Sequence, residues 1–222
     1  NAISNSKPAQ EYLQSRGLDS KKIEVGYNGG QFHHGARKDE TLIQQCLAYG
    51  LLIDKGLTYT NYRKTGETDA GGSPNTAENK QSVRQKAYAP FGKWSISFAL
   101  KNKENQVAGL YFRSILDKEN AKHFYLKNRQ GLYPNYPNIN TKKLIVTESI
   151  IDAASLLQID EITKNHSVLA CYGTNGLNEE IQNVILDLKE LEEIIFAFDN
   201  DEAGNEAVKK YAEQFKQFKI EY

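Results

Sequence analysis

The last third of the chain alternates short apolar runs with segments of helical spacing, and this alternation constrains its fold more than any other feature. The apolar runs predict strands at residues 143–147, 167–172, 193–198 and 219–222. The segments between them predict helices at residues 149–158, 178–189 and 202–215. Apolar strands that alternate with helices are typical of a parallel sheet with right-handed crossovers. We therefore predict an α/β domain, and the ligands of such sheets gather at the carboxyl ends of the strands.

Acidic side chains stand at two of these carboxyl ends. Glu148 follows the first strand directly, and Asp152 comes four residues later on the same face of the predicted helix. Asp199 and Asp201 follow the third strand and point the same way in extended chain. A divalent cation is the usual means of keeping such crowded carboxylates ionised, and oxygen ligands favour Mg²⁺ or Mn²⁺ over zinc. Glu148, Asp199 and Asp201 are therefore predicted to meet at a metal site.

The same acids could instead have purely structural roles at helix N-termini. A polar turn is also predicted after the second strand. Asp201 would be the N-cap of the last helix, and Glu148 a first-turn acid that the helix macrodipole favours. The second predicted strand ends in Gly173, Thr174 and Asn175, where the glycine allows a tight turn and the two polar side chains offer contacts.

The first 141 residues have a mixed pattern that predicts an α+β part. Helices are expected at residues 7–16 and 39–49, a hairpin at residues 94–112 and a further strand at residues 123–126. Residues 64–86 contain almost no large apolar groups, so they cannot bury enough surface to offset the entropy of ordering. We expect a mobile surface loop there.

Charge divides the chain near the same point. The net charge is zero, but residues 1–142 hold 21 Lys and Arg against 12 Asp and Glu, and residues 143–222 hold 7 Lys against 16 acids. This asymmetry predicts a basic part, residues 1–141, that faces nucleic acid, and an acidic α/β domain at residues 142–222.

Hydropathy and cysteine content argue against membrane proteins and disulfide-rich proteins. No apolar stretch approaches the roughly 20 residues that a membrane span needs, so no membrane contact is expected. Cys46 and Cys171 are far apart among apolar or aromatic neighbours, which argues against a disulfide and favours a cytoplasmic protein. The chain starts with Asn1 and contains no Met, so we interpret it as a fragment.

Three segments carry a resemblance to a known family: KLIVTESIIDAASLLQ, SVLACYGTN and EIIFAFDNDEAGNEAVKK. They resemble the topoisomerase-primase (Toprim) fold, whose pattern is a strand ending in Glu with Asp four residues on, a Gly-Thr turn, and Asp-x-Asp followed by Ala-Gly. The segments AQEYLQSRGL, LIQQCLAYGLL and FALKNKENQVAGLYFR extend the resemblance to the catalytic core of bacterial DnaG-type primases.

The resemblance implies a metal-dependent nucleotidyltransferase that makes short RNA primers on single-stranded DNA. It implies Glu148 as general acid or base, and Mg²⁺ or Mn²⁺ held by Glu148, Asp199 and Asp201 with support from Asp152. Its partners would be the DNA template, nucleoside triphosphates and a replicative helicase in the bacterial cytoplasm. The basic residues implied for phosphate contacts are Arg113, Lys93, Lys122, Lys127 and Arg129.

The sequence departs from the family pattern in ways that keep other functions open. Ser95 stands where the family usually has Arg, and Lys127 is displaced from the family's Lys position. In the family a further acidic motif follows the fourth strand, and this chain ends at Tyr222 before it, so we expect a truncated Toprim domain. Zinc is expected only in the family's template-binding module, which we expect to be absent from this chain. One alternative is a non-catalytic Toprim nucleic-acid-binding module of a mobile element, and another is a Toprim nuclease. A dinucleotide-binding domain is a weaker alternative, because Glu148-Ser149-Ile150 stands where that class has its glycine-rich motif.

Overall fold

The computed structural model describes residues 3–32, 38–62, 81–116 and 123–222. Their contacts form two compact units: unit 1 comprises residues 1–29 and 92–222, and unit 2 comprises residues 30–91. The boundary near residue 142 that charge predicts lies inside unit 1, and a domain division there stays a prediction.

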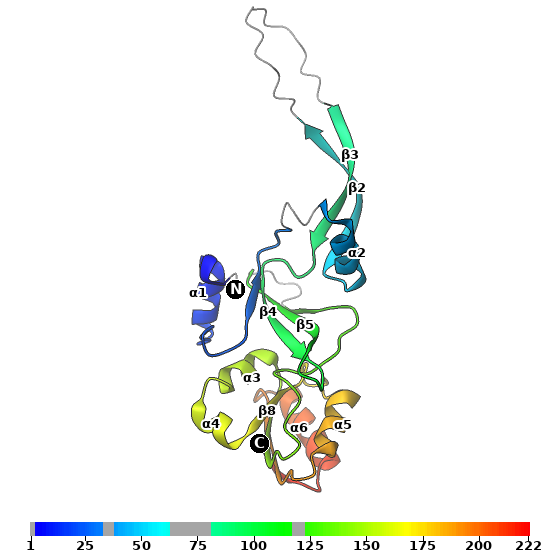
Figure 1. Cartoon of the computed structure of the whole chain (residues 1–222). Coiled ribbons are helices and arrows are strands. Elements are labelled where there is room, and N and C mark those ends of the chain that lie inside the picture. The colour runs from blue at the N-terminus through cyan, green and yellow to red at the C-terminus, as the bar shows by residue number, and fades with distance from the viewer. Residues whose placement is uncertain (1–2, 33–37, 63–80, 117–122) are drawn as a thin grey trace, which may run out of the picture. The chain divides into compact units, whose positions relative to one another are not determined.

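The C-terminal part of unit 1 is a four-stranded parallel sheet in the order β10-β9-β7-β8, which confirms the predicted α/β class (Figure 1). Its strands are β7 (Lys143–Thr147), β8 (Ser167–Ala170), β9 (Glu193–Ala197) and β10 (Lys219–Glu221). The helices that connect them are α3 (Ile150–Leu156), α4 (Asp160–Asn165), α5 (Glu179–Asp187) and α6 (Glu202–Gln214). The structure thus has two short helices between β7 and β8, where the sequence predicts one at residues 149–158.

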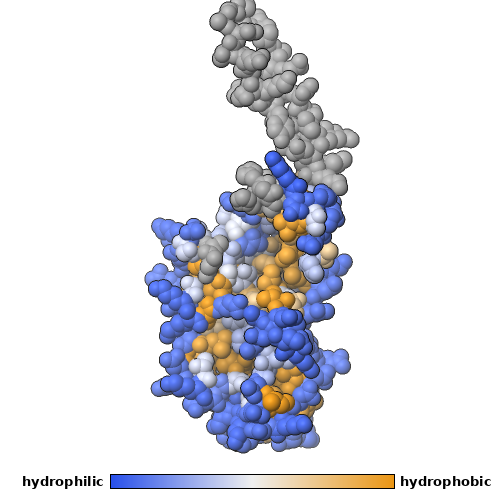
Figure 2. All heavy atoms as spheres, in the orientation of Figure 1, coloured by the Kyte–Doolittle hydropathy of each residue, from blue (hydrophilic) through white to orange (hydrophobic). Residues whose placement is uncertain are grey.

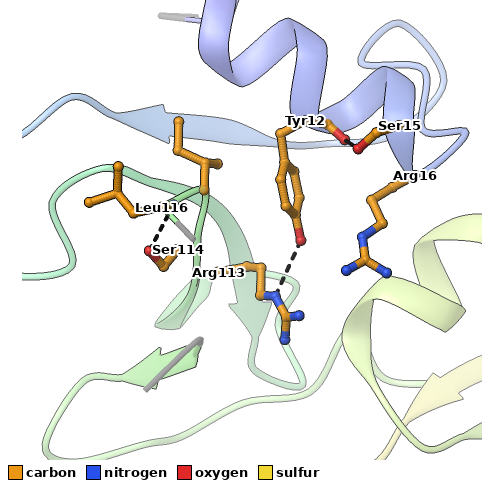
Figure 3. Close-up of a pocket in the computed structure, with 7 residues that line it drawn as sticks. Tyr12, Ser15, Arg16, Arg113, Ser114 and Leu116 are labelled. Atoms are coloured by element: carbon orange, nitrogen blue, oxygen red, sulfur yellow. Dashed lines mark hydrogen bonds between the residues drawn. The ribbon is translucent and has the colours of Figure 1, made fainter. Parts of the chain in front are cut away.

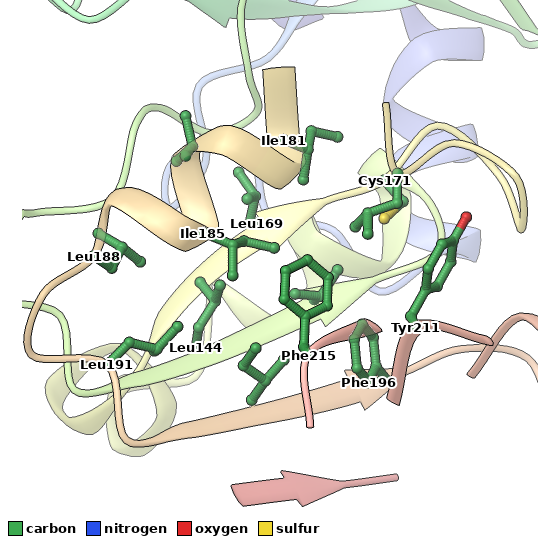
Figure 4. Close-up of a cluster of buried hydrophobic side chains, with 14 of the residues drawn as sticks. Leu144, Leu169, Cys171, Ile181, Ile185, Leu188, Leu191, Phe196, Tyr211 and Phe215 are labelled. Atoms are coloured by element: carbon green, nitrogen blue, oxygen red, sulfur yellow. The ribbon is translucent and has the colours of Figure 1, made fainter. Parts of the chain in front are cut away.

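The apolar strands are continuous runs because both faces of this sheet are buried. Along β8 and the residue after it, Leu169 and Cys171 belong to one hydrophobic cluster, while Val168 and Ala170 belong to another. Figure 4 shows the first cluster, in which α5 and α6 pack against the sheet. Its fully buried members include Leu144, Leu169, Ile181, Ile185, Ile194 and Phe215.

The second cluster joins this sheet to the N-terminal elements of unit 1. Those elements are η1 (Ile3–Asn5), α1 (Lys7–Ser15) and an antiparallel sheet in the order β1-β4-β5-β6. Its strands are β1 (Gly26–Asn28), β4 (Ser95–Lys101), β5 (Val107–Ser114) and β6 (His123–Tyr125). Leu13 of α1 and Phe98 of β4 are in one cluster with Ala153 of α3 and Val168 of β8. The two sheets of unit 1 therefore share a core.

Local signals explain where the N-terminal elements begin and end. Ser6 caps α1 through its Oγ, and Gly17 follows the helix with φ +66°. The predicted hairpin at residues 94–112 is confirmed by the pairing of β4 with β5. The bend between these strands places Asn105 at φ +59°, a conformation that Asn tolerates better than most residues.

Unit 2 contains a helix and an antiparallel pair of strands. The helix α2 (Glu40–Ala48) begins at its N-cap Asp39, as the spacing predicts. Strand β2 (Leu52–Tyr62) pairs with β3 (Gln81–Pro90). Residues 81–86 therefore belong to β3 rather than to the predicted loop at 64–86, because ladder hydrogen bonds satisfy the backbone without a run of large apolar residues. Residues 64–80 lie outside the described residues.

The surface and the cysteines agree with the sequence. Hydrophilic residues dominate the face drawn in Figure 2, with smaller hydrophobic areas between them. Cys46 and Cys171 are both free thiols, as predicted. Within the described part of the chain, no helix is long and apolar enough to cross a membrane.

Candidate functional site

The carboxyl edge of the parallel sheet brings Glu148 and Asp199 together. Glu148 directly follows β7, and Asp199 lies two residues after β9. The two strands are adjacent and parallel, with Thr147 in register with Ala197. The backbone N–H of Asp199 donates a hydrogen bond to the Glu148 carboxylate, with 3.3 Å between N and Oε2. Two segments about fifty residues apart in the chain thus meet at one carboxylate, as the alternating pattern predicts.

The electrostatics of Glu148 show how closely the acids are grouped. Burial raises the pKa of Glu148, and the negative charges of Asp199, Asp201 and Asp152 raise it further. The hydrogen bond from the Asp199 backbone acts in the opposite direction. Asp199, Asp201 and Asp152 therefore all lie within electrostatic range of Glu148, and a cation bound beside Glu148 would offset this repulsion.

Two of these acids also have local structural duties. Asp201 is the N-cap of α6, where its Oδ1 accepts a hydrogen bond from the Gly204 N–H at 2.8 Å. Asp152 closes a capping box at the start of α3, where its Oδ2 accepts from the Ser149 hydroxyl at 2.6 Å and from the Ser149 N–H at 3.2 Å. The structural alternative for Asp201 is thus real, and one of its oxygens is already engaged.

The donor atoms fit a hard divalent cation, but they are not gathered around one point. Carboxylate oxygens are the ligands that Mg²⁺ and Mn²⁺ prefer. Nevertheless, among the residues that the structure describes, no three His, Cys, Asp or Glu side chains are grouped closely enough to hold a metal ion. Metal binding at this edge would therefore require the carboxylates to move closer together than they lie in the described part of the chain.

The Gly-Thr turn after β8 is tied to the same edge. The Gly173 N–H donates to the Glu148 carbonyl oxygen at 3.0 Å, and Gly173 has φ +98°, a conformation that other residues rarely adopt. The Thr174 carbonyl accepts from the Tyr211 hydroxyl at 2.9 Å, which fixes the turn to α6. The predicted turn of Gly173, Thr174 and Asn175 thus lies beside Glu148.

Gly204 is a further determinant of this edge. A Cβ added at Gly204 would lie 2.0 Å from the Asp199 carbonyl oxygen. Only glycine lets α6 begin this close to the backbone that carries Asp199. A glycine near the start of a helical pattern is the sequence signal that could have identified this close approach.

The predicted phosphate-binding residues fall in different places. Arg113 on β5 is partly buried, and its Nε donates to the Tyr12 hydroxyl at 3.2 Å. Arg113, Tyr12 and Arg16 line a pocket of about 380 Å³ together with Ser15, Ser114, Ile115 and Leu116 (Figure 3). Arg16 is not predicted from the sequence, because a single Arg at the end of a helix carries no distinctive signal.

Arg129 is placed by aromatic rings. Its Cζ lies 4.1 Å from the ring centroid of Tyr172 and 4.9 Å from that of Tyr125, both within cation–π range. Tyr172 directly precedes the Gly173 turn, so the stacked guanidinium is near the carboxyl edge of the sheet. Lys93 and Lys127 are exposed, and Lys122 lies outside the described residues.

The parallel sheet with acids at its carboxyl edge is the arrangement predicted for a Toprim domain. Residues 145–222 match the family described as Toprim-like, which confirms the fold predicted from the three motifs. Over most of its length, the chain is similar to DNA primases.

A DNA primase of Legionella pneumophila is 24% identical over 220 residues, which cover 91% of this chain and 31% of that protein. A DNA primase domain from Pseudomonas aeruginosa superposes with a TM-score of 0.63 at 20% identity, covering 96% of this chain and 61% of that one. A DnaG primase catalytic domain bound to ssDNA gives 0.61 at 19% identity, covering 93% and 58%. The chain has the fold of a DnaG primase catalytic core and spans less than two thirds of each relative.

Proposed function

We propose that this chain carries the catalytic centre of a DNA primase, a metal-dependent nucleotidyltransferase that makes short RNA primers on single-stranded DNA in the bacterial cytoplasm. The observation that carries the proposal is the meeting of Glu148 with the Asp199 segment at the carboxyl edge of the Toprim-like sheet. The relatives support it, since one is a DNA primase and another is a primase domain bound to ssDNA. A replicative helicase stays a predicted partner.

The proposed roles follow from the chemistry of each group. Glu148, Asp199 and Asp201 would hold Mg²⁺ or Mn²⁺, with Asp152 nearby. When bound, the metal supplies positive charge that offsets the charge of a nucleoside triphosphate. Glu148 would accept or return the proton of the attacking hydroxyl, since, unlike Asp152 and Asp201, it caps no helix. Arg113 and Arg129 would hold phosphate groups of template, primer or nucleotide.

Template-directed incorporation of labelled ribonucleotides by the protein tests this proposal. We expect Glu148→Gln to lower incorporation by at least about 100-fold, the usual contribution of a positioned acid or base. The matched control is Glu190→Gln, which removes one acidic charge at an exposed position away from the edge. Incorporation by Glu148→Gln at the level of the Glu190→Gln control would exclude the role of Glu148.

Calorimetric titration with Mn²⁺ forms the metal arm of the same test. Asparagine is the informative substitution at Asp199 and Asp201, because an Asn at position 201 still caps α6 and an Ala would cost about 1 kcal/mol of cap stability. We expect Asp199→Asn and Asp201→Asn each to weaken Mn²⁺ binding at least tenfold with unchanged melting temperature. If both variants bind Mn²⁺ with the affinity of the wild type, the proposed metal site is excluded.

A second function has its own support, namely nucleic-acid binding without catalysis. Ser95 occupies the position where the family resemblance implies an Arg, and it is fully buried. In addition, the acids in the described part of the chain are not gathered for metal binding. If single-stranded DNA binds but no product forms at any Mg²⁺ or Mn²⁺ concentration, this second function is favoured. Metal-dependent cleavage of the DNA instead would indicate the nuclease alternative.

A further inference from the structure

A pocket of about 420 Å³ lies at the amino-terminal edge of the parallel sheet, opposite the edge that carries Glu148. Lys143 begins β7 and Glu148 directly follows this strand, so its five residues place about 16 Å between the two edges. The ten lining residues come from the segment before β7, the end of α4 and the start of β8, and all of them are polar or positively charged. The pocket is therefore separate from the candidate catalytic site.

The lining contains no acid, although most of it lies in the acidic part of the chain. Three of its members are Lys142, Lys143 and Lys164. Lys143 forms an ion pair with Glu193 at 2.9 Å, and Lys142 lies 3.9 Å from Glu192, so both of these charges are partly neutralised. Lys164 has no ion-pair partner in the described part of the chain. Its ammonium group is therefore the charge that a ligand in this pocket can use.

The imidazole of His166, another lining residue, has a buried nitrogen without a partner. Among the residues that the structure describes, His166 Nδ1 is the one buried side-chain nitrogen or oxygen that makes no hydrogen bond. Such atoms are rare in proteins, because burial removes the hydrogen bond to water. The backbone of His166 is fixed as the C-cap of α4, where its N–H donates to the Ile162 carbonyl at 2.8 Å. A ligand in the pocket can supply the partner that the ring nitrogen lacks.

The donors of the pocket favour a phosphate group. Thr141 Oγ1 and Ser167 Oγ lie 2.8 Å apart, so one hydroxyl proton is used between them and the other is available to a ligand. Ammonium, imidazole and hydroxyl groups all donate hydrogen bonds to phosphate oxygens. The carbonyl end of α4 opposes an anion, but this helix has six residues, and Lys164 in its last turn offsets the small dipole.

The size and the surroundings of the pocket favour a small molecule over a nucleic-acid strand. Its volume is near the lower end of the range of small-molecule sites. Acids lie on the neighbouring elements, with Asp160 and Glu161 in the first turn of α4 and Glu192 directly before β9. A single phosphate can be held beside Lys164, whereas a strand would carry further phosphates over these acids and be repelled.

We propose that this pocket binds the phosphate group of a small phosphorylated molecule. Lys164 supplies the charge, His166 supplies a ring nitrogen, and the hydroxyl pair of Thr141 and Ser167 supplies a further donor. The site goes beyond the proposed function and does not depend on it, because no residue of the carboxyl edge takes part.

Calorimetric titration of the protein with ribose 5-phosphate tests the proposal, with ribose as the probe that lacks the phosphate. EDTA in the buffer removes divalent metal, so the candidate metal site cannot hold the phosphate. We expect ribose 5-phosphate to bind and ribose not to bind. We expect Lys164→Gln to weaken binding of ribose 5-phosphate about tenfold, the size of a lost charge-assisted hydrogen bond. A wild-type protein that binds neither probe, or both equally, would overturn the proposal.

The matched control is Lys189→Gln, which removes an exposed positive charge just beyond α5 and outside the pocket. We expect it to change binding of ribose 5-phosphate by less than about twofold. Glu148→Gln should bind this probe as the wild type does, because Glu148 lies at the opposite edge of the sheet. The proposal is overturned if Lys164→Gln behaves like Lys189→Gln, or if Glu148→Gln shows the loss instead.

His166→Phe separates ligand binding from a structural role of the imidazole. Phenylalanine keeps an aromatic ring and removes the unpaired nitrogen, so we expect an unchanged or higher melting temperature in phosphate-free buffer. The same variant should bind ribose 5-phosphate about fivefold more weakly, the size of one neutral hydrogen bond. A lower melting temperature with unchanged binding would contradict the role of His166.

A fluorescent oligothymidylate separates a small ligand from a nucleic-acid strand. We expect Lys164→Gln and Lys189→Gln to bind it with equal affinity. A loss confined to Lys164→Gln would show that the pocket holds a strand and would overturn the choice of a small ligand. The proposed function fails separately, since a protein that makes no primer but loses ribose 5-phosphate binding on Lys164→Gln would keep this site alone.

Discussion

At the scale of single residues, helix capping and the proposed chemistry use the same carboxylates. Asp201 caps α6, and Asp152 accepts two hydrogen bonds from Ser149. Each Asp has a second oxygen for which the structure gives no hydrogen bond. Capping can therefore hold the side chain near the sheet edge while one oxygen stays available to a ligand.

Gly204 gives a prediction at this scale. In most helices a Gly→Ala change is favourable, by about 0.5–1 kcal/mol. Here the new Cβ would meet the Asp199 carbonyl oxygen at 2.0 Å, so the backbone must move. We expect Gly204→Ala to lower the free energy of unfolding by about 1–3 kcal/mol, as measured by urea denaturation.

The control for this prediction is Gly29→Ala. A Cβ there would lie 3.3 Å from the Tyr27 ring, which is a side chain that can shift. We expect a change within about 0.5 kcal/mol in that variant. A Gly204→Ala protein as stable as the wild type would show that the approach of α6 to Asp199 is not tight.

At the scale of elements, Glu193 ties three strands of the parallel sheet together. Its carboxylate is buried in β9 and forms ion pairs with Lys143 of β7, at 2.9 Å, and with Lys219 of β10. Lys143 and Lys219 are the register partners of Glu193 on either side. Hydrogen bonds from Lys219 and then Lys143 lower the pKa of Glu193 to about 2.

This lowered pKa predicts a pH-dependent contribution to stability. A carboxylate whose pKa is lower in the folded state stabilises the protein above its ordinary pKa of 4.5 and loses that contribution as pH falls toward about 2. We expect Glu193→Gln to lower the melting temperature by several degrees at pH 7. The difference from wild type should shrink between pH 4.5 and about 2, in thermal melts monitored by circular dichroism.

Glu192→Gln is the control for this prediction, because Glu192 is exposed and lies 3.9 Å from Lys142. Exposed pairs contribute little, so we expect almost no change in melting temperature. A Glu193→Gln difference that stays constant from pH 7 to pH 2 would show that its cause is packing rather than charge.

At the scale of the whole molecule, the core and the charge divide the chain in different places. The charge changes sign near residue 142, but the hydrophobic cluster that contains Phe98 also contains Ala153 and Val168. Unit 2, residues 30–91, is instead inserted between two segments of unit 1. Its two ends leave unit 1 close together, because Asn28 of β1 is in register with Ser95 of β4.

Two deletions test this organisation. Removing residues 30–91 and joining the ends with a short Gly-Ser linker should leave a cooperatively melting protein, since unit 1 keeps both hydrophobic clusters. Residues 143–222 alone would expose the apolar face formed by Ile150, Ala153, Ala154, Val168 and Ala170. We expect that fragment to melt without cooperativity and to bind a hydrophobic dye. A stable, cooperative 143–222 fragment would support the domain boundary that the charge predicts.

Local sequence patterns by themselves determined most of the strands and helices of this protein and part of its candidate site. The apolar runs of 143–198 determined the strands of the parallel sheet, and the ends of these runs placed Glu148 and Asp199 at one edge. Capping residues such as Ser6 and Asp39 determined where helices begin. These features follow from the periodicity of strands and helices and from unpaired N–H groups, all of which act within a few residues.

Only the tertiary structure decided the features that depend on residues far apart in the chain. The pairing of β3 with β2 placed residues 81–86 in a strand, although their composition predicts a loop. The packing of α1 beside β5 brought Arg16 and Arg113 to Tyr12, and the start of α6 brought Gly204 against the Asp199 carbonyl oxygen. No local pattern encodes these contacts, because each exists only after the sheets and helices have packed around a common core.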